Sequence, residues 1–274
     1  MSTILVVANE TLGGASLLQA VSDKAGPDDR VVVCVPRNRP REGYVIYDDA
    51  VFDAAQVRID LARQFLRERG INAIGDVGDP DPYTATMDAV AEWRPDEIIV
   101  STFPATSSGW LRRDIIERIQ EATGLPVTHV VTDVDTDGLP FDVTLVVANR
   151  TASSEKLLES LRSKKGDGGR ERLFIVVIPQ EGGGGTAAQA ARGRLGQLVD
   201  RMRAEGMVCA GMIADPDPYT ATMNALQFFR VDDIVISTLP ATRSGWLRAD
   251  LIERVRRATN MSVEHVEATA PVEA

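Results

Sequence analysis

The chain has 274 residues, a formal net charge of −10 at pH 7, and 44% hydrophobic against 26% charged residues. This composition is typical of a globular protein, and the length leaves room for two domains with cores of their own. The negative charge argues against nucleic acid as a partner, because binding a phosphate backbone needs a positive surface. No apolar run approaches the roughly 20 residues that cross a bilayer, and the N-terminus lacks the pattern of a signal peptide.

The two cysteines point to a reducing compartment. Cys34 and Cys209 both lie in apolar runs, where a free thiol behaves as a small buried hydrophobic group. Disulfides, in contrast, persist in oxidising compartments. We therefore expect a cytoplasmic protein with two buried thiols, no disulfide and no metal site.

The first half of the chain alternates short apolar runs with amphipathic stretches. We expect helices at residues 15–22, 54–69, 83–92 and 115–123, and strands at 4–9, 31–36, 71–78, 97–102 and 126–131. A long loop is expected to precede the second helix, and Gly70 to end it. β-branched strands separated by helices are typical of a parallel sheet covered on both faces. The pattern predicts a doubly wound α/β domain.

The second half repeats the first. The nonapeptide DPDPYTATM occurs at 79–87 and again 136 residues later at 215–223, and the block ST-x-P-A-T begins at Ser101 and Ser237 with the same offset. A period this long indicates duplicated domains and not a solenoid of short units. We place the domains at 1–134 and 143–274, joined by a polar, turn-rich linker at 135–142.

The nonapeptide itself has a structural explanation. Asp79 and Asp81 each precede a proline, and Asp at the N-cap followed by Pro at the first helical position is a signal for a helix start. Met87, Val90 and Ala91 are expected to form the packing face of that helix. The nonapeptide therefore marks the architecture and not the chemistry.

The second shared block is the better candidate for a binding site. If the strand order is 3-2-1-4-5, the ends of the first and fourth strands meet at the switch point, where doubly wound sheets bind ligands. Hydroxyls, amides, glycines and an arginine gathered there suit a phosphate or another small anion. The candidate ligand-binding residues are Asn9, Val35, Ser101, Thr102, Thr106, Ser108, Gly109 and Arg112 in the first half, and Asn149, Ile178, Ser237, Thr238, Thr242, Ser244, Gly245 and Arg248 in the second.

A plain, solvated loop is the alternative explanation of the same block. Asp114 with Glu117, and Asp250 with Glu253, have the spacing of a capping box at the start of the last helix. In that reading Arg112 and Arg248 pair with the aspartates, and Trp110 and Trp246 cover the core. Both readings stay open from the sequence.

The two histidines are matched by the repeat, since His129 and His265 both lie on the fifth strands. Neither is near a cysteine or another recognisable nucleophile, and no P-loop lysine or G-x-S-x-G motif occurs. We therefore expect no catalytic residue. A hydrolase or transferase acting on a nucleotide is the rival hypothesis.

These features together resemble the universal stress protein superfamily in its tandem form. The resemblance covers both halves, including Gly-Asp-Pro at 78–80, Ala-Asp-Pro at 214–216 and the long loop after the fourth strand. It implies two Rossmann-like domains of the adenine nucleotide alpha hydrolase-like type, each with a five-stranded parallel sheet of order 3-2-1-4-5 flanked by helices. It also implies a cytoplasmic stress-response role and pairing through the fifth strands, where His129 and His265 would be interface residues. Such pairing would form an intramolecular pseudo-dimer or a homodimer.

Members of that superfamily that bind ATP or AMP carry the signature G-x-x-G, nine residues, then G-[S/T]. Here Ser101 and Pro104 stand at the first two glycines, and Asp114 at the final hydroxyl position. A carboxylate at that position repels a phosphate. The sequence therefore predicts a regulatory or binding protein that holds an adenine nucleotide or another small anion in a non-standard pocket. The alternative is a structural or interaction module that binds no nucleotide and forms the pseudo-dimer.

Overall fold

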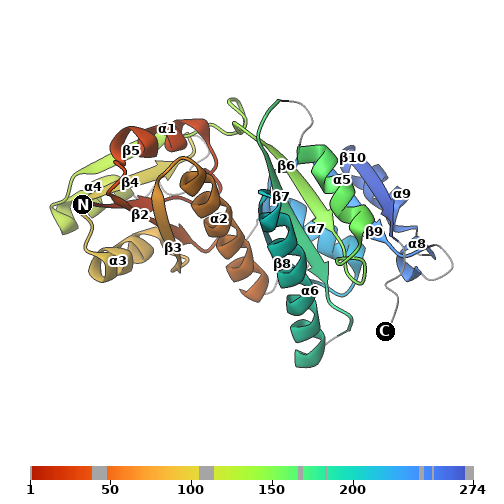
Figure 1. Cartoon of the computed structure of the whole chain (residues 1–274). Coiled ribbons are helices and arrows are strands. Elements are labelled where there is room, and N and C mark those ends of the chain that lie inside the picture. Colours follow the sequence, from red (N-terminus) through yellow and green to blue (C-terminus); the bar gives the residue numbers. More distant parts are fainter. Residues whose placement is uncertain are drawn as a thin grey trace. The chain divides into compact units, whose positions relative to one another are not determined.

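The computed structural model describes residues 2–38, 48–104, 114–165, 169–182, 184–240, 244–248 and 250–268, without the side chains of 247 and 248. The chain forms two compact units, the first containing β1 to β5 and the second β6 to β10 (Figure 1). No described helix is both long enough and apolar enough to cross a membrane.

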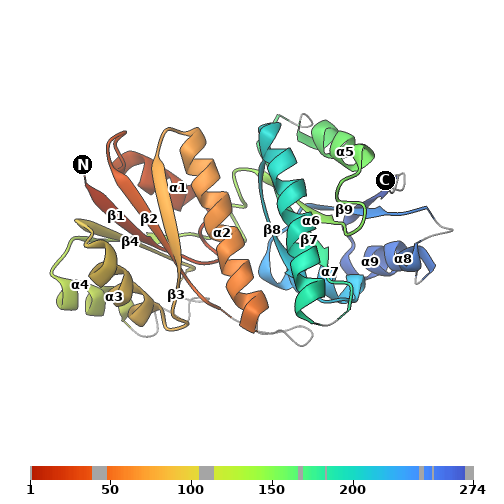
Figure 2. The same ribbon diagram turned by 60° about the horizontal axis from the view of Figure 1, so that its bottom comes forward.

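The first unit is a five-stranded parallel sheet of order β3-β2-β1-β4-β5. Its elements are β1 (Thr3–Val7), α1 (Ala15–Lys24), β2 (Arg30–Pro36), α2 (Asp48–Glu68), β3 (Asn72–Gly78), α3 (Pro82–Trp93), β4 (Glu97–Thr102), α4 (Ile115–Thr123) and β5 (Val127–Val131). Helices α1 and α2 pack on one face, and α3 and α4 on the other (Figure 2).

The second unit repeats this topology, with sheet order β10-β9-β6-β7-β8 and all strands parallel. Its elements are β6 (Asp142–Val147), α5 (Glu155–Lys165), β7 (Arg172–Pro179), α6 (Gly185–Ala204), β8 (Val208–Ala214), α7 (Pro218–Phe228), β9 (Asp233–Thr238), α8 (Gly245–Arg248), α9 (Leu251–Thr259) and β10 (Ser262–Glu267). The predicted fold class and the predicted order 3-2-1-4-5 are confirmed in both units.

The cores explain why the central strands are apolar along their whole length. In β1, Leu5 and Val7 contact the α3 and α4 side, whereas Ile4 and Val6 contact the α1 and α2 side. All four are at most 1% exposed. A strand covered on both faces needs apolar residues at every position. The two cysteines are buried as expected, and burial raises the pKa of the Cys34 thiol to about 12.

The nonapeptide starts a helix in both units, as predicted. Asp81 is the N-cap of α3 and accepts a hydrogen bond from the Thr84 amide at 3.0 Å, and Asp217 caps α7 in the same way. Asp79 instead accepts from the Asp81 amide at 2.8 Å, which forms the turn before the helix. The block is therefore a structural joint.

The predicted packing face of α3 is confirmed at Val90, which packs against the core, but is wrong for Met87 and Ala91. Ala85 and Ala89 are buried in that core, while Met87 is half-buried and Ala91 is exposed. The reason is a close approach to Gly78, where an added Cβ would lie 2.6 Å from the Ala85 Cβ. Only small side chains fit at that distance.

Two expectations about helix starts also need correction. Helix α2 begins at Asp48, six residues before the predicted start at 54, and its acidic first turn suits the positive end of the helix dipole. The capping boxes at Asp114 and Asp250 do not form: φ is 47° and 54°, in the left-handed region, and neither side chain makes a capping bond. An N-cap carboxylate reaches the helix amides from extended backbone.

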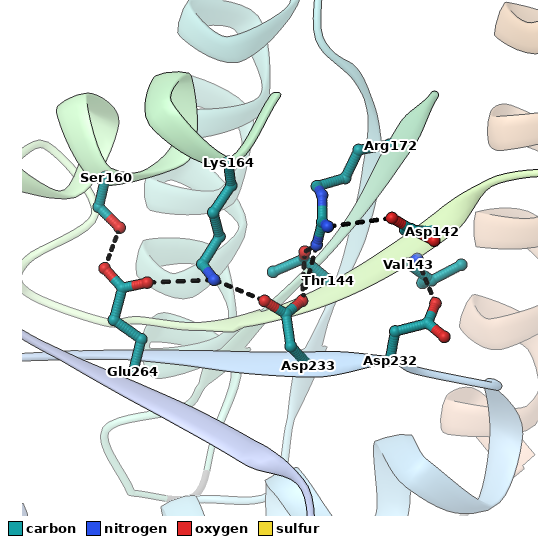
Figure 3. Close-up of polar contacts among 9 residues, drawn as sticks. All are labelled: Asp142, Val143, Thr144, Ser160, Lys164, Arg172, Asp232, Asp233 and Glu264. Atoms are coloured by element: carbon teal, nitrogen blue, oxygen red, sulfur yellow. Dashed lines mark hydrogen bonds and ion pairs between the residues drawn. The ribbon is translucent and has the colours of Figure 1, made fainter. Parts of the chain in front are cut away.

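A polar network ties together the amino ends of the strands in the second unit (Figure 3). The Asp233 carboxylate accepts hydrogen bonds from the Thr144 hydroxyl at 2.6 Å, the Lys164 ammonium at 2.5 Å and the Arg172 guanidinium at 3.1 Å. At its ends, Lys164 also pairs with Glu264 at 3.1 Å and Arg172 with Asp142 at 3.1 Å. The network therefore joins α5 to four strands of the sheet.

Candidate functional site

A cavity of about 290 Å³ lies in the second unit, at the carboxyl ends of the strands. It is formed by the residues after β6 and β7, by the end of β9 and by α8. Its lining residues are Asn149, Arg150, Thr151, Glu181, Ser237, Thr238, Leu239, Ser244, Gly245 and Trp246. Because β6 and β9 are neighbours and the order reverses at β6, this is the switch point of the sheet.

The rim of the cavity is charged. Glu181 forms ion pairs with Arg150 and, at 3.3 Å, with Arg194 of α6. The hydrogen bond from Arg150 is the main reason that the pKa of Glu181 is lowered. Arg194 also donates to the Asn149 side-chain oxygen at 2.7 Å. Arg150 thus lines the cavity, and Arg194 is held behind it by the lining residues Glu181 and Asn149.

The floor of the cavity carries hydroxyl groups. Ser237 is 1% exposed, and its Oγ has no hydrogen-bond partner among the residues that the structure describes. The Thr151 hydroxyl donates to the Ser237 carbonyl at 3.1 Å, and the Thr238 hydroxyl contacts His265 Nε2 at 2.8 Å. A buried polar atom without a partner needs an explanation, and a ligand or a water molecule is the usual one.

A comparison of the two repeats shows why the Ser237 hydroxyl lacks the partner that its equivalent has. In the first unit the equivalent Ser101 Oγ lies 3.0 Å from the Thr132 Oγ1. The residue 136 positions after Thr132 is Ala268, which is buried and has no hydroxyl. The second copy therefore keeps the serine and has alanine in place of the threonine.

The first unit has related groups at its own switch point. Asn9 donates to the Pro36 carbonyl at 2.7 Å, while its Oδ1 has no partner within the described part of the chain. Glu10 accepts from Asn38 at 2.8 Å, where the second unit has the Arg150–Glu181 pair. Ser101 and Thr102 are buried at the end of β4.

The remaining candidates divide into two groups. Val35 and Ile178 are fully buried in the hydrophobic cores, and Ile178 does not line the cavity. The candidates that lie outside the described residues or side chains are Thr106, Ser108, Gly109, Arg112, Thr242 and Arg248.

Sequence reasoning missed Arg194, which donates to Asn149, and its repeat equivalent Arg58. Arg194 lies on α6 and Arg58 on α2, 136 residues apart, so the repeat register was the signal that could have found them. Burial lowers the pKa of Arg58 to about 10, with the Glu10 charge acting in the opposite direction. Both arginines come from the second helix of their repeat, far in sequence from the blocks that looked informative.

The histidines lie beside the last residue of each fourth strand. His129 Nε2 is 2.9 Å from the Thr102 Oγ1, matching the His265–Thr238 contact in the second unit. Partial burial lowers the pKa of both imidazoles below the ordinary value. Their expected interface role stays a prediction.

Within the described ranges, no group of three or more His, Cys, Asp or Glu side chains could hold a metal ion.

Comparison with solved structures finds distant likenesses. No protein-family model and no curated protein matches the chain. A universal stress protein from Archaeoglobus fulgidus is 18% identical over 99% of this chain and 98% of that chain, with a TM-score of 0.36. A candidate universal stress protein from Pseudomonas aeruginosa is 16% identical over 98% of this chain and 94% of that chain, with a TM-score of 0.33. Neither likeness is close enough to transfer a family or a function to this chain.

Proposed function

We propose that this chain is a binding and regulatory protein of the universal stress type, and that its second unit binds a small anion. The site is the cavity at the carboxyl ends of β6 and β9, and the ligand class is a phosphate group, free or carried by a small molecule such as AMP or ATP. The observation that carries the proposal is the buried Ser237 hydroxyl, which has no partner among the described residues. It lies at a cavity that Arg150 lines, with Arg194 bonded to the lining residues Asn149 and Glu181.

The charges at the rim support an anion over a neutral ligand. Arg150 and Arg194 share Glu181, so the two cations are held in place with one carboxylate between them. A guanidinium presents several N–H donors that match the oxygens of phosphate. An incoming phosphate can take over hydrogen bonds that Glu181 now accepts, and Ser237 and Thr238 add hydroxyl donors from the floor.

The cavity size favours a small ligand. Pockets that enclose drug-sized molecules measure about 300–1,000 Å³, and this one is near 290 Å³. That volume suits a phosphate with a small organic group. The missing phosphate glycines of the sequence point the same way, since a nucleotide bound here would be held by side chains instead of a glycine loop.

The test is calorimetric titration with phosphate, AMP and ATP, supported by thermal unfolding. A ligand present at about 100 times its Kd stabilises the folded state by about 2.7 kcal/mol, which raises Tm by several degrees for a unit of this size. Ser237→Ala and Arg194→Met should each weaken binding about tenfold, because each removes a hydrogen bond to an anion.

Ser101→Ala is the matched control, because it removes the equivalent hydroxyl from the first unit. It should leave the Kd unchanged. If no phosphate-bearing ligand gives heat or a rise in Tm, the proposal is wrong. Equal losses in Ser237→Ala and Ser101→Ala would also count against the assigned cavity.

A second candidate function is that of an interaction module that pairs through its fifth strands. The observation that favours it is the edge strand β5, where Val131 is 49% exposed. An open edge with an apolar side chain is a template for another strand.

Pairing should protect the outward-facing β5 amides from hydrogen exchange, and Val131→Lys should remove that protection. Light scattering then separates the cases, since a monomeric mass indicates pairing within one chain and a doubled mass indicates a homodimer. Rapid exchange of these amides in the unmodified protein would refute pairing.

A further inference from the structure

One hydroxyl of the cavity is connected to a titratable group. Thr238 is the last residue of β9, is 2% exposed and lines the cavity. On the neighbouring strand, His265 pairs in register with Ile236, so its side chain reaches along the sheet to Thr238. The His265 Nε2 lies 2.8 Å from the Thr238 Oγ1, and within the described part of the chain no other group bonds to that hydroxyl.

The hydrogen bond between Thr238 and His265 can have either of two directions, depending on which atom carries the proton. A threonine hydroxyl has one proton to donate and two lone pairs, while a neutral imidazole has one N–H and one acceptor nitrogen. If Nε2 accepts, the hydroxyl proton points at His265, and the hydroxyl offers a ligand only its two lone pairs. If Nε2 carries a proton, it donates to the Thr238 oxygen, and the hydroxyl proton is free for a ligand. Imidazolium has protons on both nitrogens, so it permits only the second state.

The first unit has the same pair with a different constraint. The Thr102 hydroxyl also lies 2.9 Å from the carbonyl of Phe103, to which it donates. Its single proton is then engaged, so His129 Nε2 donates to the Thr102 oxygen even when the imidazole is neutral. The hydroxyl of Thr102 has no proton left for a ligand. The two repeats therefore place similar residues in similar positions with different proton arrangements.

We propose that His265 is a positioning residue that decides whether the Thr238 hydroxyl donates its proton to the imidazole or to a ligand. Protonation of His265 then increases the affinity of the second unit's cavity for anions. This proposal rests on the proposed function, since it concerns the same cavity. Neutral His265 carries its proton on Nδ1 and accepts from Thr238. Protonated His265 donates to Thr238, and Thr238 donates to the anion. By linkage, a bound anion raises the affinity of His265 for its proton.

The charged groups around His265 set the pH range. Burial lowers its pKa below the ordinary value of 6.5; Glu267 on the same strand raises it, and Arg256 of α9 lowers it. Arg256 is paired with Glu253 at 2.7 Å. From α5, Lys164 is paired with Glu264 of β10 at 3.1 Å. In the absence of a ligand, His265 therefore becomes protonated on the acidic side of pH 6.5.

The experiment measures the Kd of sulfate by calorimetry at about pH 8 and about pH 5. Sulfate stays doubly charged across this range, so the probe itself does not titrate. The pKa of Glu181 is lowered from 4.5, which keeps that carboxylate charged in the same window. We expect sulfate to bind about tenfold more tightly at the lower pH, because the second state supplies a donor where the first presents a lone pair.

Three variants separate positioning from other effects. His265→Gln should make the Kd independent of pH, because an amide side chain bonds to Thr238 without titrating. His129→Gln is the matched control and should keep the tenfold dependence. Thr238→Val should bind sulfate no more tightly at the lower pH than at the higher one. Thr238→Ser keeps a hydroxyl and should show the tenfold tighter binding at the lower pH.

Nitrogen-15 NMR of the imidazoles gives a second readout, which does not require a ligand. The chain has only two histidines, so each Gln variant assigns the other. At about pH 8 we expect the proton on Nδ1 in His265 and on Nε2 in His129. A proton on Nε2 of neutral His265 would overturn the proposal.

The outcomes distinguish this proposal from the proposed function. If sulfate, phosphate and nucleotides all fail to bind at both pH values, the proposed function fails, and with it the inference that rests on it. If sulfate binds equally well at both pH values, or if His265→Gln keeps the dependence, the cavity stands and the role of His265 is wrong.

Discussion

The Asp233 carboxylate holds the polar network of the second unit together, so its removal should destabilise that unit selectively. Asp233→Asn keeps the shape of the side chain and removes the charge. The Lys164 ammonium and the Arg172 guanidinium, which bond to it at 2.5 and 3.1 Å, then lose their common counter-ion (Figure 3). The side chains of Asp233, Lys164 and Arg172 are only 15%, 19% and 13% exposed.

The magnitude follows from that burial. Breaking a fully buried ion pair by removing one partner costs about 3–5 kcal/mol. Here Lys164 keeps Glu264 and Arg172 keeps Asp142, and solvent reaches the edges of the network. We therefore expect the free energy of unfolding of the second unit to fall by about 2–3 kcal/mol. The matched position in the first unit is Glu97, which pairs with Lys24 at 21% and 33% exposure. Glu97→Gln should cost at most about 1 kcal/mol.

Hydrogen exchange read by mass spectrometry resolves the two units in one molecule. A loss of 2–3 kcal/mol should accelerate exchange of the most protected amides of β6 and β9 by about 30- to 150-fold. Amides of β1 and β4 serve as the internal reference and should not change. Asp233→Glu, which retains the charge and copies the residue type of the first unit, should stay within about 1 kcal/mol of the original protein.

The reasoning would be refuted by an equal effect of Asp233→Asn and Glu97→Gln, since the two sites differ in burial and in the number of cations. It would also be refuted by a double-mutant cycle of Asp233→Asn with Lys164→Met that shows no coupling, because residues in one network should couple by about 0.5–3 kcal/mol.

Three further predictions concern the backbone and pH. Gly211→Ala should destabilise the second unit by about 1–3 kcal/mol in urea unfolding, because the added Cβ would lie 2.4 Å from a carbonyl oxygen of β7; Gly193→Ala, with open space around it, should be neutral or stabilising. Asp250→Gly should stabilise by about 0.5 kcal/mol by thermal unfolding, since φ is 54° there, and a loss of stability would contradict this. Stability should fall between about pH 7 and 5, because the folded pKa values of His129 and His265 lie below 6.5 and the unfolded chain binds more protons in that window; His265→Gln should flatten the slope, and an unchanged slope in variants of both histidines would exclude this cause.

The sequence by itself determined the architecture. The apolar runs of the central strands, the offset of 136 residues and the aspartate–proline helix starts each act locally or through simple burial. They predicted the order of elements and the N-caps at Asp81 and Asp217, while the strand order of both sheets was implied by the resemblance to the universal stress protein superfamily. Such features depend on residues close in sequence, so their pattern can be read along the chain.

The tertiary structure decided which side chains meet at the cavity. Arg194 reaches Asn149 from α6, and His265 reaches Thr238 from the adjacent strand. The Ser237 hydroxyl has no partner among the described residues, because the equivalent of Thr132, the residue after the fifth strand, is Ala268. Each of these contacts joins residues that are more than 25 positions apart. Their chemistry depends on a distance in space, and periodicity along the chain does not contain that distance.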